Sequence, residues 1–168
     1  MQWGALPKNL FGVDLMPKRI EAAKQRYPGI QFTQGNAEHL DFEETFFDLV
    51  LLFTVFTSIL DNRMSRNVAG EVERVLKPAG VVVWYDFRYN NPYNHNVRGM
   101  TKEAIRMFFP NFRLKLRTVT LLPPLARRLG RATAALYPIL SSLPCLRTHY
   151  TGILVKPGEA GLTGFRAD

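Results

Sequence analysis

The chain has 168 residues, of which 46% are hydrophobic and 21% charged, so whole-chain disorder is excluded and one globular domain is the simplest organisation. We predict that this domain covers residues 1–156 and that residues 157–168 form a flexible tail. The formal net charge is +8, which suits anionic partners, yet no Lys/Arg run interleaved with aromatic residues predicts a specific nucleic-acid site.

The first half of the chain alternates short apolar runs with amphipathic segments. A strand is expected at 10–15, a helix from Pro17 to a stop at Pro28, and a second strand at 30–34. The run 47–56 is apolar on both faces, as expected of a central parallel strand covered by helices. Asp61 can cap a following helix, whose apolar stripe is Met64, Val68, Val72 and Val75.

The second half continues with a strand at 81–85 and a short helix from Thr101 to Phe109. The alternation at 113–117 predicts an exposed antiparallel edge strand. One or two helices are expected between Pro123 and Pro144, and a final strand at 150–155. This order predicts an α/β fold, a Rossmann-like three-layer sandwich whose mostly parallel sheet ends in antiparallel strands.

Ligands of such sheets bind beyond the carboxyl ends of the strands, so the residues there are the candidates. Asp14 ends the first strand, and its carboxylate could accept both hydroxyls of a ribose, with Leu15 and Met16 offering apolar surface to an adenine. Asn36 and the Ala37 N–H, after the second strand, could meet the adenine edge. Each signal alone also fits an ordinary strand-end acid or a Gly-Asn turn.

The order and spacing of these segments, with Val75-Leu76-Lys77-Pro78-Ala79-Gly80, resemble the class I S-adenosylmethionine-dependent methyltransferase family, type 11 in particular, over residues 9–156. The resemblance implies S-adenosylmethionine as cofactor, held by Asp14 at the ribose. Asn36 stands where the family more often has Asp. Phe53 and Thr54 would border the methionine portion.

The family also has a strand and a Gly-x-Gly-x-Gly loop upstream of the position of Asn9, and this sequence contains no Gly-x-Gly. We therefore expect a Rossmann-like sheet lacking that first strand. The strands at 10–15 and 47–56 would then close on each other, or exchange between copies in a homodimer, or cause self-association through open edges.

The loop after the strand at 81–85 would form the acceptor side. Asp86 could be a general base, and Tyr85 or Arg88 could orient the acceptor; a plain polar loop is the alternative. The Arg-rich segment 127–131 is expected to cover the pocket rather than lie on anionic lipid. His39, His95 and His149 show no metal-ligand spacing, so no metal site is expected.

The predicted function is methyl transfer from S-adenosylmethionine to a small or lipid-like acceptor. The alternative is a non-catalytic methyltransferase-like remnant that acts as a binding or interaction protein. The sequence shows no signal-peptide pattern or membrane span, and its single cysteine, Cys145, is expected to be a buried thiol in a reducing compartment, so a cytoplasmic protein is expected.

Overall fold

The computed structural model describes residues 5–92, 94–122, 128, 130 and 132–158. Its internal contacts divide the chain into two compact units, Met1–Phe42 and Glu43–Asp168. Three of the five residues of the predicted lid segment (127, 129 and 131) and most of the predicted tail (159–168) lie outside the described residues. No helix in the described part of the chain is both long and apolar enough to span a bilayer.

The first unit is a strand–helix–strand element. A short 3₁₀ turn, η1 (Pro7–Asn9), precedes β1 (Phe11–Asp14), α1 (Pro17–Arg26) and β2 (Gln31–Gln34). The two strands pair in parallel from Phe11 opposite Gln31 to Asp14 opposite Gln34. Pro17 occupies the first turn of α1, where its missing N–H costs nothing. The three elements predicted here are confirmed.

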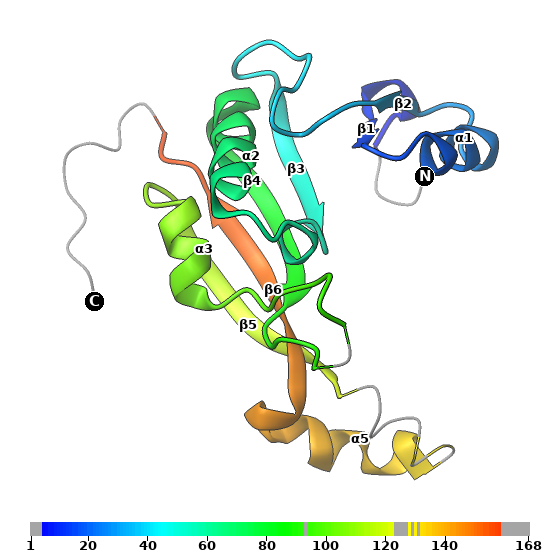
Figure 1. Ribbon diagram of the computed structural model, residues 1–168, viewed down its shortest axis with the longest axis vertical. Helices are drawn as coiled ribbons and strands as arrows, with labels where there is room; N and C mark the ends of the chain where they lie inside the picture. Colours follow the sequence, from blue (N-terminus) through cyan, green and yellow to red (C-terminus); the bar gives the residue numbers. More distant parts are fainter. Residues whose placement is uncertain (1–4, 93, 123–127, 129, 131, 159–168) are drawn as a thin grey trace. The chain divides into compact units, whose positions relative to one another are not determined.

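The second unit contains a four-stranded sheet in the order β3-β4-β6-β5. β3 (Phe47–Phe53) is parallel to β4 (Leu76–Phe87), whereas β6 (Arg147–Val155) runs antiparallel to both β4 and β5 (Arg113–Leu121). Figure 1 shows the long β4 and β6 side by side in this sheet. The α/β class and the antiparallel strands at the C-terminal end are confirmed.

One face of this sheet is packed against α2 (Asn62–Val75) and α3 (Lys102–Phe108) (Figure 1). Both helices begin at the predicted caps: Asp61 accepts the Met64 N–H at 2.8 Å, and Thr101 accepts the Ala104 N–H at 3.2 Å. The core between helices and sheet consists of fully or almost fully buried side chains: Phe56, Val68, Val72, Val82, Trp84, Ile105, Phe109 and Leu154.

β3 differs from its prediction as a central strand covered on both faces. It lies at the edge of the four-stranded sheet, and Leu49, Leu51 and Phe53 are each at least half exposed. The predicted closure of the first strand on this one is also wrong, because β1 and β3 belong to separate sheets. β1 pairs instead with β2, its neighbour through a short crossover, which costs little loop-closure entropy. Self-association stays a prediction, which sedimentation of the purified chain would test.

Two local features also depart from the sequence interpretation. β4 begins at Leu76, five residues before the predicted start, and passes through Pro78 and through Ala79 at φ 60°. Between α5 (Ala132–Ser142) and β6 lies a 3₁₀ turn, η3 (Pro144–Leu146), and its Cys145 is exposed rather than buried. The turn's own backbone bonds hold it outside the core, so its apolar residues do not reach the interior.

Alanine substitutions at Gly152 and Gly70 form a matched pair, because each adds one methyl group. A Cβ at Gly152 would collide with the backbone carbonyl oxygen of Lys115 on β5, whereas a Cβ at Gly70 on α2 would meet nothing within 4 Å. We expect Gly152→Ala to lower the free energy of unfolding by more than about 2 kcal/mol by separating β5 from β6. Gly70→Ala should raise it by about 0.5–1 kcal/mol. Urea unfolding measures both, and a neutral Gly152→Ala would contradict this close approach.

Candidate functional site

Asp14 lies at the carboxyl end of β1, where the sequence predicted a ribose-binding acid. Its Oδ1 accepts the Met16 N–H at 2.8 Å, and its Oδ2 lies 3.4 Å from Arg19 Nη1. The side chain remains one third exposed, so the carboxylate can still receive donors from a ligand. This bond satisfies the N–H of Met16, the N-cap residue of α1, whose own side chain makes no capping hydrogen bond.

The two side chains that follow Asp14 form an exposed apolar surface, since Leu15 is 62% and Met16 50% exposed. Asn36 follows the paired strand: Gly35 N–H donates to the Asp14 carbonyl at 3.1 Å, so both loops leave the same end of the sheet. Asn36 Oδ1 accepts the Glu38 N–H at 3.0 Å in a tight turn that contains Ala37. The first unit therefore brings together all five residues predicted to hold the adenosine.

Phe53 and Thr54 end β3 in the second unit. Phe53 is the register partner of Tyr85, and their rings meet edge to face at 6.1 Å. Thr54 adopts φ 54°, a left-handed conformation that is uncommon for a β-branched residue, and its N–H donates to the Tyr85 carbonyl at 2.8 Å. Strained backbone of this kind gathers at binding sites, and here it turns the chain away just beyond the sheet.

Tyr85 is half-buried and joins three strands. Its hydroxyl lies 3.0 Å from Thr120 Oγ1 on β5, and its ring stacks on His149 of β6 with centroids 4.6 Å apart and planes 13° from parallel. Phe87 packs against the other side of this group, 4.1 Å from the His149 centroid. Tyr85 is thus held in a fixed orientation, as a residue that orients a ligand must be.

Asp86 points into the core rather than toward a ligand. It is 1% exposed, and its two oxygens accept the N–H groups of Thr57 at 3.0 Å and of Phe87 at 2.8 Å. Burial raises the pKa of Asp86 to about 6, although these backbone donors act in the opposite direction. The geometry therefore disfavours Asp86 as the general base and makes it the tie between β4 and the 3₁₀ turn η2 (Phe56–Ser58).

Arg88 holds backbone in place. Its Nη1 donates to the carbonyl oxygen of Pro144 at 3.0 Å, and its guanidinium lies over the rings of Tyr89 and Tyr150. These contacts fix the start of β6 beside the end of β4. Arg88 is consequently a positioning residue in this structure, and contact with an acceptor stays a prediction.

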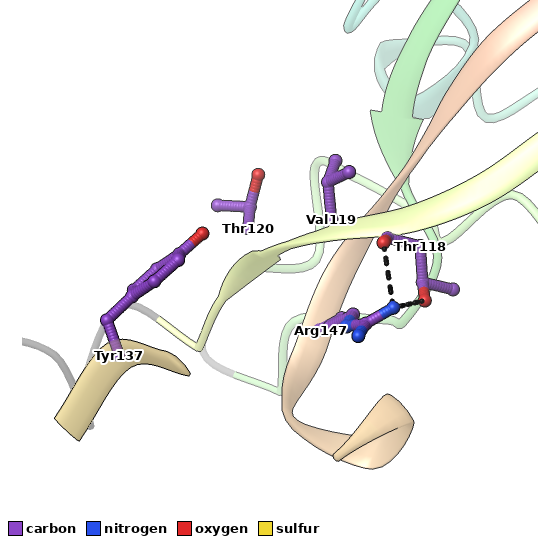
Figure 2. A pocket seen from close by; sticks show the side chains of 5 residues that line it. All are labelled: Thr118, Val119, Thr120, Tyr137 and Arg147. Carbon is purple, nitrogen blue, oxygen red and sulfur yellow. Dashed lines mark hydrogen bonds between the residues drawn. The ribbon is translucent and has the colours of Figure 1, made fainter. Parts of the chain in front are cut away.

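An open cavity of about 210 Å³ adjoins these strands, lined by Thr118, Val119, Thr120, Tyr137 and Arg147. Figure 2 shows Tyr137 on α5 facing the end of β5, with Arg147 hydrogen-bonded to Thr118. Val119 is the register partner of His149, and Thr120 is the hydroxyl partner of Tyr85. Two lining residues therefore adjoin the aromatic group formed by Tyr85, Phe87 and His149, although none of these three lines the cavity itself.

Sequence reasoning missed Thr120, Arg147, Thr148 and His149. Their roles depend on the register of β5 and β6, which places Val119 opposite His149, and on Thr120 at φ 64° near the strand end. The sequence offered one signal for this group: a histidine that stands among alternating polar and apolar residues just before the last predicted strand. Its partners lie up to 64 residues away in the chain, from Tyr85 to His149, and no local pattern names them.

Comparison with known sequences finds one matching family model, the methyltransferase domain (type 11), over residues 1–84. A phthiotriol/phenolphthiotriol dimycocerosates methyltransferase of Mycobacterium ulcerans is 39% identical over 87 residues, 51% of this chain and 31% of the relative. An uncharacterized methyltransferase of Synechocystis is 36% identical over 77 residues, 46% of this chain and 36% of that protein. The matched segment thus spans about a third of these relatives.

Solved structures give the same fold. A SAM-dependent methyltransferase from Methanosarcina mazei superposes with a TM-score of 0.64 at 19% identity, covering 89% of this chain and 82% of that one. The N-methyltransferase NodS from Bradyrhizobium japonicum gives a TM-score of 0.64 at 16% identity, covering 89% and 74%. At these identities the likeness concerns the fold alone.

The buried Asp86 should give stability a recognisable pH dependence. Because its pKa is raised in the folded state, its contribution is fully present below the ordinary carboxyl pKa and is lost as the pH rises through about 6. The loss between about pH 4 and pH 7 should reach up to about 3 kcal/mol. Urea unfolding should show this slope in the wild type and not in Asp86→Asn. Asp41→Asn, at an exposed position, should keep the slope, and equal slopes in all three proteins would contradict the assignment.

Proposed function

The chain belongs to the methyltransferase domain family whose model matches its residues 1–84, and we propose that it transfers a methyl group from S-adenosylmethionine to a small or lipid-like acceptor. The observation that carries the proposal is the partly exposed Asp14 carboxylate beside the exposed Leu15 and Met16, within the segment that matches the family. Adenosine requires this combination, a hydrogen-bond acceptor for its ribose hydroxyls next to an apolar surface for its adenine ring.

The first unit fits the adenosine half of S-adenosylmethionine. We assign the ribose hydroxyls to the Asp14 carboxylate, because a carboxylate accepts two hydrogen bonds without donating any. Leu15 and Met16 are assigned to the adenine face, and Asn36 with the Ala37 N–H to its polar edge. Asn36 retains an amide that can rotate from Glu38 toward a ligand, and it brings no charge to this contact.

We assign Phe53 and Thr54 to the methionine portion and Tyr85 to the acceptor. When bound, S-adenosylmethionine supplies an activated methyl group on a positively charged sulfur. Phe53 and Tyr85 present aromatic rings, whose faces stabilise cations, and Thr54 turns the backbone beside them. A Gly-x-Gly loop for the methionine carboxylate does not occur in this sequence, so these residues offer only part of the contacts that the family uses.

The acceptor class follows from the relatives and from the cavity. The mycobacterial relatives are named for methylating phthiotriol and phenolphthiotriol dimycocerosates, which supports a lipid-like acceptor for this chain. Tyr85, Phe87 and Tyr137 give the neighbourhood of the cavity the aromatic surface that such a molecule needs. Arg88 and Arg147 then fix the backbone around it through their bonds to carbonyl oxygens.

The role of Asp14 can be tested by titrating S-adenosylhomocysteine into the purified chain in a calorimeter. Asp14→Ala should weaken binding by about 1–3 kcal/mol, because the ribose loses a charged acceptor. Asp14→Asn keeps an oxygen for the Met16 N–H and should show a smaller loss, which separates ligand binding from helix capping.

Arg19→Ala serves as the control, since it removes the ion pair and leaves the carboxylate in place. It should bind as the wild type does, with circular dichroism confirming that all three variants are folded. A wild-type chain that binds no S-adenosylhomocysteine at millimolar ligand, or an Asp14→Ala variant with unchanged affinity, would contradict the assignment.

A further inference from the structure

The hydrogen bonds around His149 fix which of its ring nitrogens carries the proton. Thr148 Oγ1 donates its only hydrogen to the Thr120 carbonyl oxygen at 3.1 Å. The same oxygen lies 2.9 Å from His149 Nδ1, and having no second hydrogen it can only accept there. Both contacts can be hydrogen bonds at the same time only when Nδ1 carries the proton, and the lone pair of the neutral ring is then on Nε2.

The position of His149 makes this lone pair relevant to the proposed reaction. In the β4–β6 ladder it lies opposite Phe87, two residues beyond the Phe53–Tyr85 pair at which β3 ends. This is the carboxyl end of the parallel pair, where ligands of α/β sheets bind. The ring is fixed by its stack on Tyr85 and its contact with Phe87, and it is 5% exposed.

His149 Nε2 has no hydrogen-bond partner among the described residues. Trp84 Nε1 and Arg98 Nε are the two fully enclosed unpaired side-chain nitrogens in the described residues, and His149 Nε2 is not one of them. None of the described residues donates a hydrogen bond to it. His149 does not itself line the cavity, but the lining residue Val119 lies opposite it in the β5–β6 ladder. A fixed ring with one nitrogen occupied and the other unpaired is suited to receive a proton from a bound molecule.

We propose that His149 Nε2 is the general base of the methyl transfer and that the acceptor is an alcohol or phenol whose hydroxyl group donates to it. The inference rests on the proposed function and deepens it. A neutral amine attacks with a lone pair that is already free, whereas a hydroxyl group must lose its proton as it is methylated, so a base at this position selects a hydroxyl acceptor.

The step balances. The hydroxyl oxygen forms a bond to the methyl carbon as the bond from that carbon to sulfur breaks, and the electrons of the broken bond stay on sulfur, which becomes a neutral thioether. The hydroxyl proton passes to Nε2, giving an imidazolium that releases it to solvent. Thr148 acts as a positioning residue, because its hydroxyl holds the ring in the form that has its lone pair on Nε2.

The electrostatic surroundings favour a neutral ring before the reaction. Burial lowers the pKa of His149. The alternation of the strands places Tyr85 of β4, Arg117 of β5 and Arg147 of β6 on the same face as the ring. The rate should consequently fall only at a pH below the ordinary imidazole pKa.

The first test reads the tautomer without any reaction. Nitrogen NMR of the isotope-labelled full chain should show His149 protonated at Nδ1 and bare at Nε2. Thr148→Ser, which keeps the hydroxyl group, should leave this pattern unchanged, and Thr148→Val should shift it toward a mixture of tautomers. A wild-type His149 protonated at Nε2 would overturn the proposal.

The second test measures transfer of the labelled methyl group of S-adenosylmethionine to cetyl alcohol in detergent micelles, with 4-hexadecylaniline, an arylamine that is neutral at the assay pH, as the matched acceptor. His149→Phe, which keeps a stacked ring, should lower turnover of the alcohol by at least about 100-fold and leave turnover of the amine within about threefold. S-adenosylhomocysteine binding should not change.

The outcomes separate this inference from the function on which it rests. Alcohol turnover in His149→Phe within about threefold of the wild type would remove His149 as the base and leave the methyltransferase assignment standing. A wild-type chain that binds S-adenosylhomocysteine and methylates only the amine would overturn the hydroxyl acceptor. A wild type that neither binds nor transfers would refute the proposed function, and this inference with it.

Discussion

The register of the antiparallel ladder between β4 and β6 is the constraint on which the second unit depends. It pairs Val81 with Val155 and Phe87 with His149, and side chains alternate between the two faces at every step. Val82, Trp84 and Leu154 therefore face α2 and α3, while Tyr85, Phe87 and His149 share the other face. A slip of one residue would put His149 into the helix-covered core and expose Trp84.

The same ladder explains why the two ends of the sheet differ. At the Val81 end the strands are joined by main-chain bonds and the apolar packing of α2, and Lys156 closes the sheet by donating to the carbonyl oxygens of Glu73 and Leu76. At the Phe87 end the main-chain bonds continue, with the Arg88 N–H donating to the Thr148 carbonyl oxygen at 2.9 Å, and side chains add bonds through Tyr85, Thr120 and Thr148. This end, which is the carboxyl end of β4, is therefore the one that carries the hydroxyl and imidazole groups.

Local signals in the sequence were sufficient for most of the elements. The caps at Asp61 and Thr101, and Pro17 at the start of α1, act within one turn of helix, so their effect can be read from neighbouring residues. The start of β4 could not be read in this way. Lys77 and Pro78 suggest a break, and they continue the strand because Phe47 on β3 pairs with Leu76 from 29 residues away.

The predictions for the candidate site also succeeded where they depended on local signals and failed where they depended on which face of a strand lies against the core. Asp14 and Asn36 lie at strand ends that the sequence located, so the structure brings them together at one end of the first unit's sheet as expected. Asp86 also lies at the expected strand end, yet its side chain points to the helix-covered face. Alternation along β4 decides this, because Tyr85 and Asp86 must face opposite ways, and the sequence alone did not fix which of them faced the core.

Asp86 and His149 show that burial of a titratable group does not by itself create a reactive site. Burial favours the uncharged form of both, raising the pKa of the carboxyl group and lowering that of the imidazole. The difference lies in their hydrogen bonds. Both Asp86 oxygens already accept backbone N–H groups and lie in the core, so neither oxygen is available to take a proton from a ligand. His149 uses only Nδ1 for structure, which leaves Nε2 to receive a proton while the ring stays where the strand register placed it.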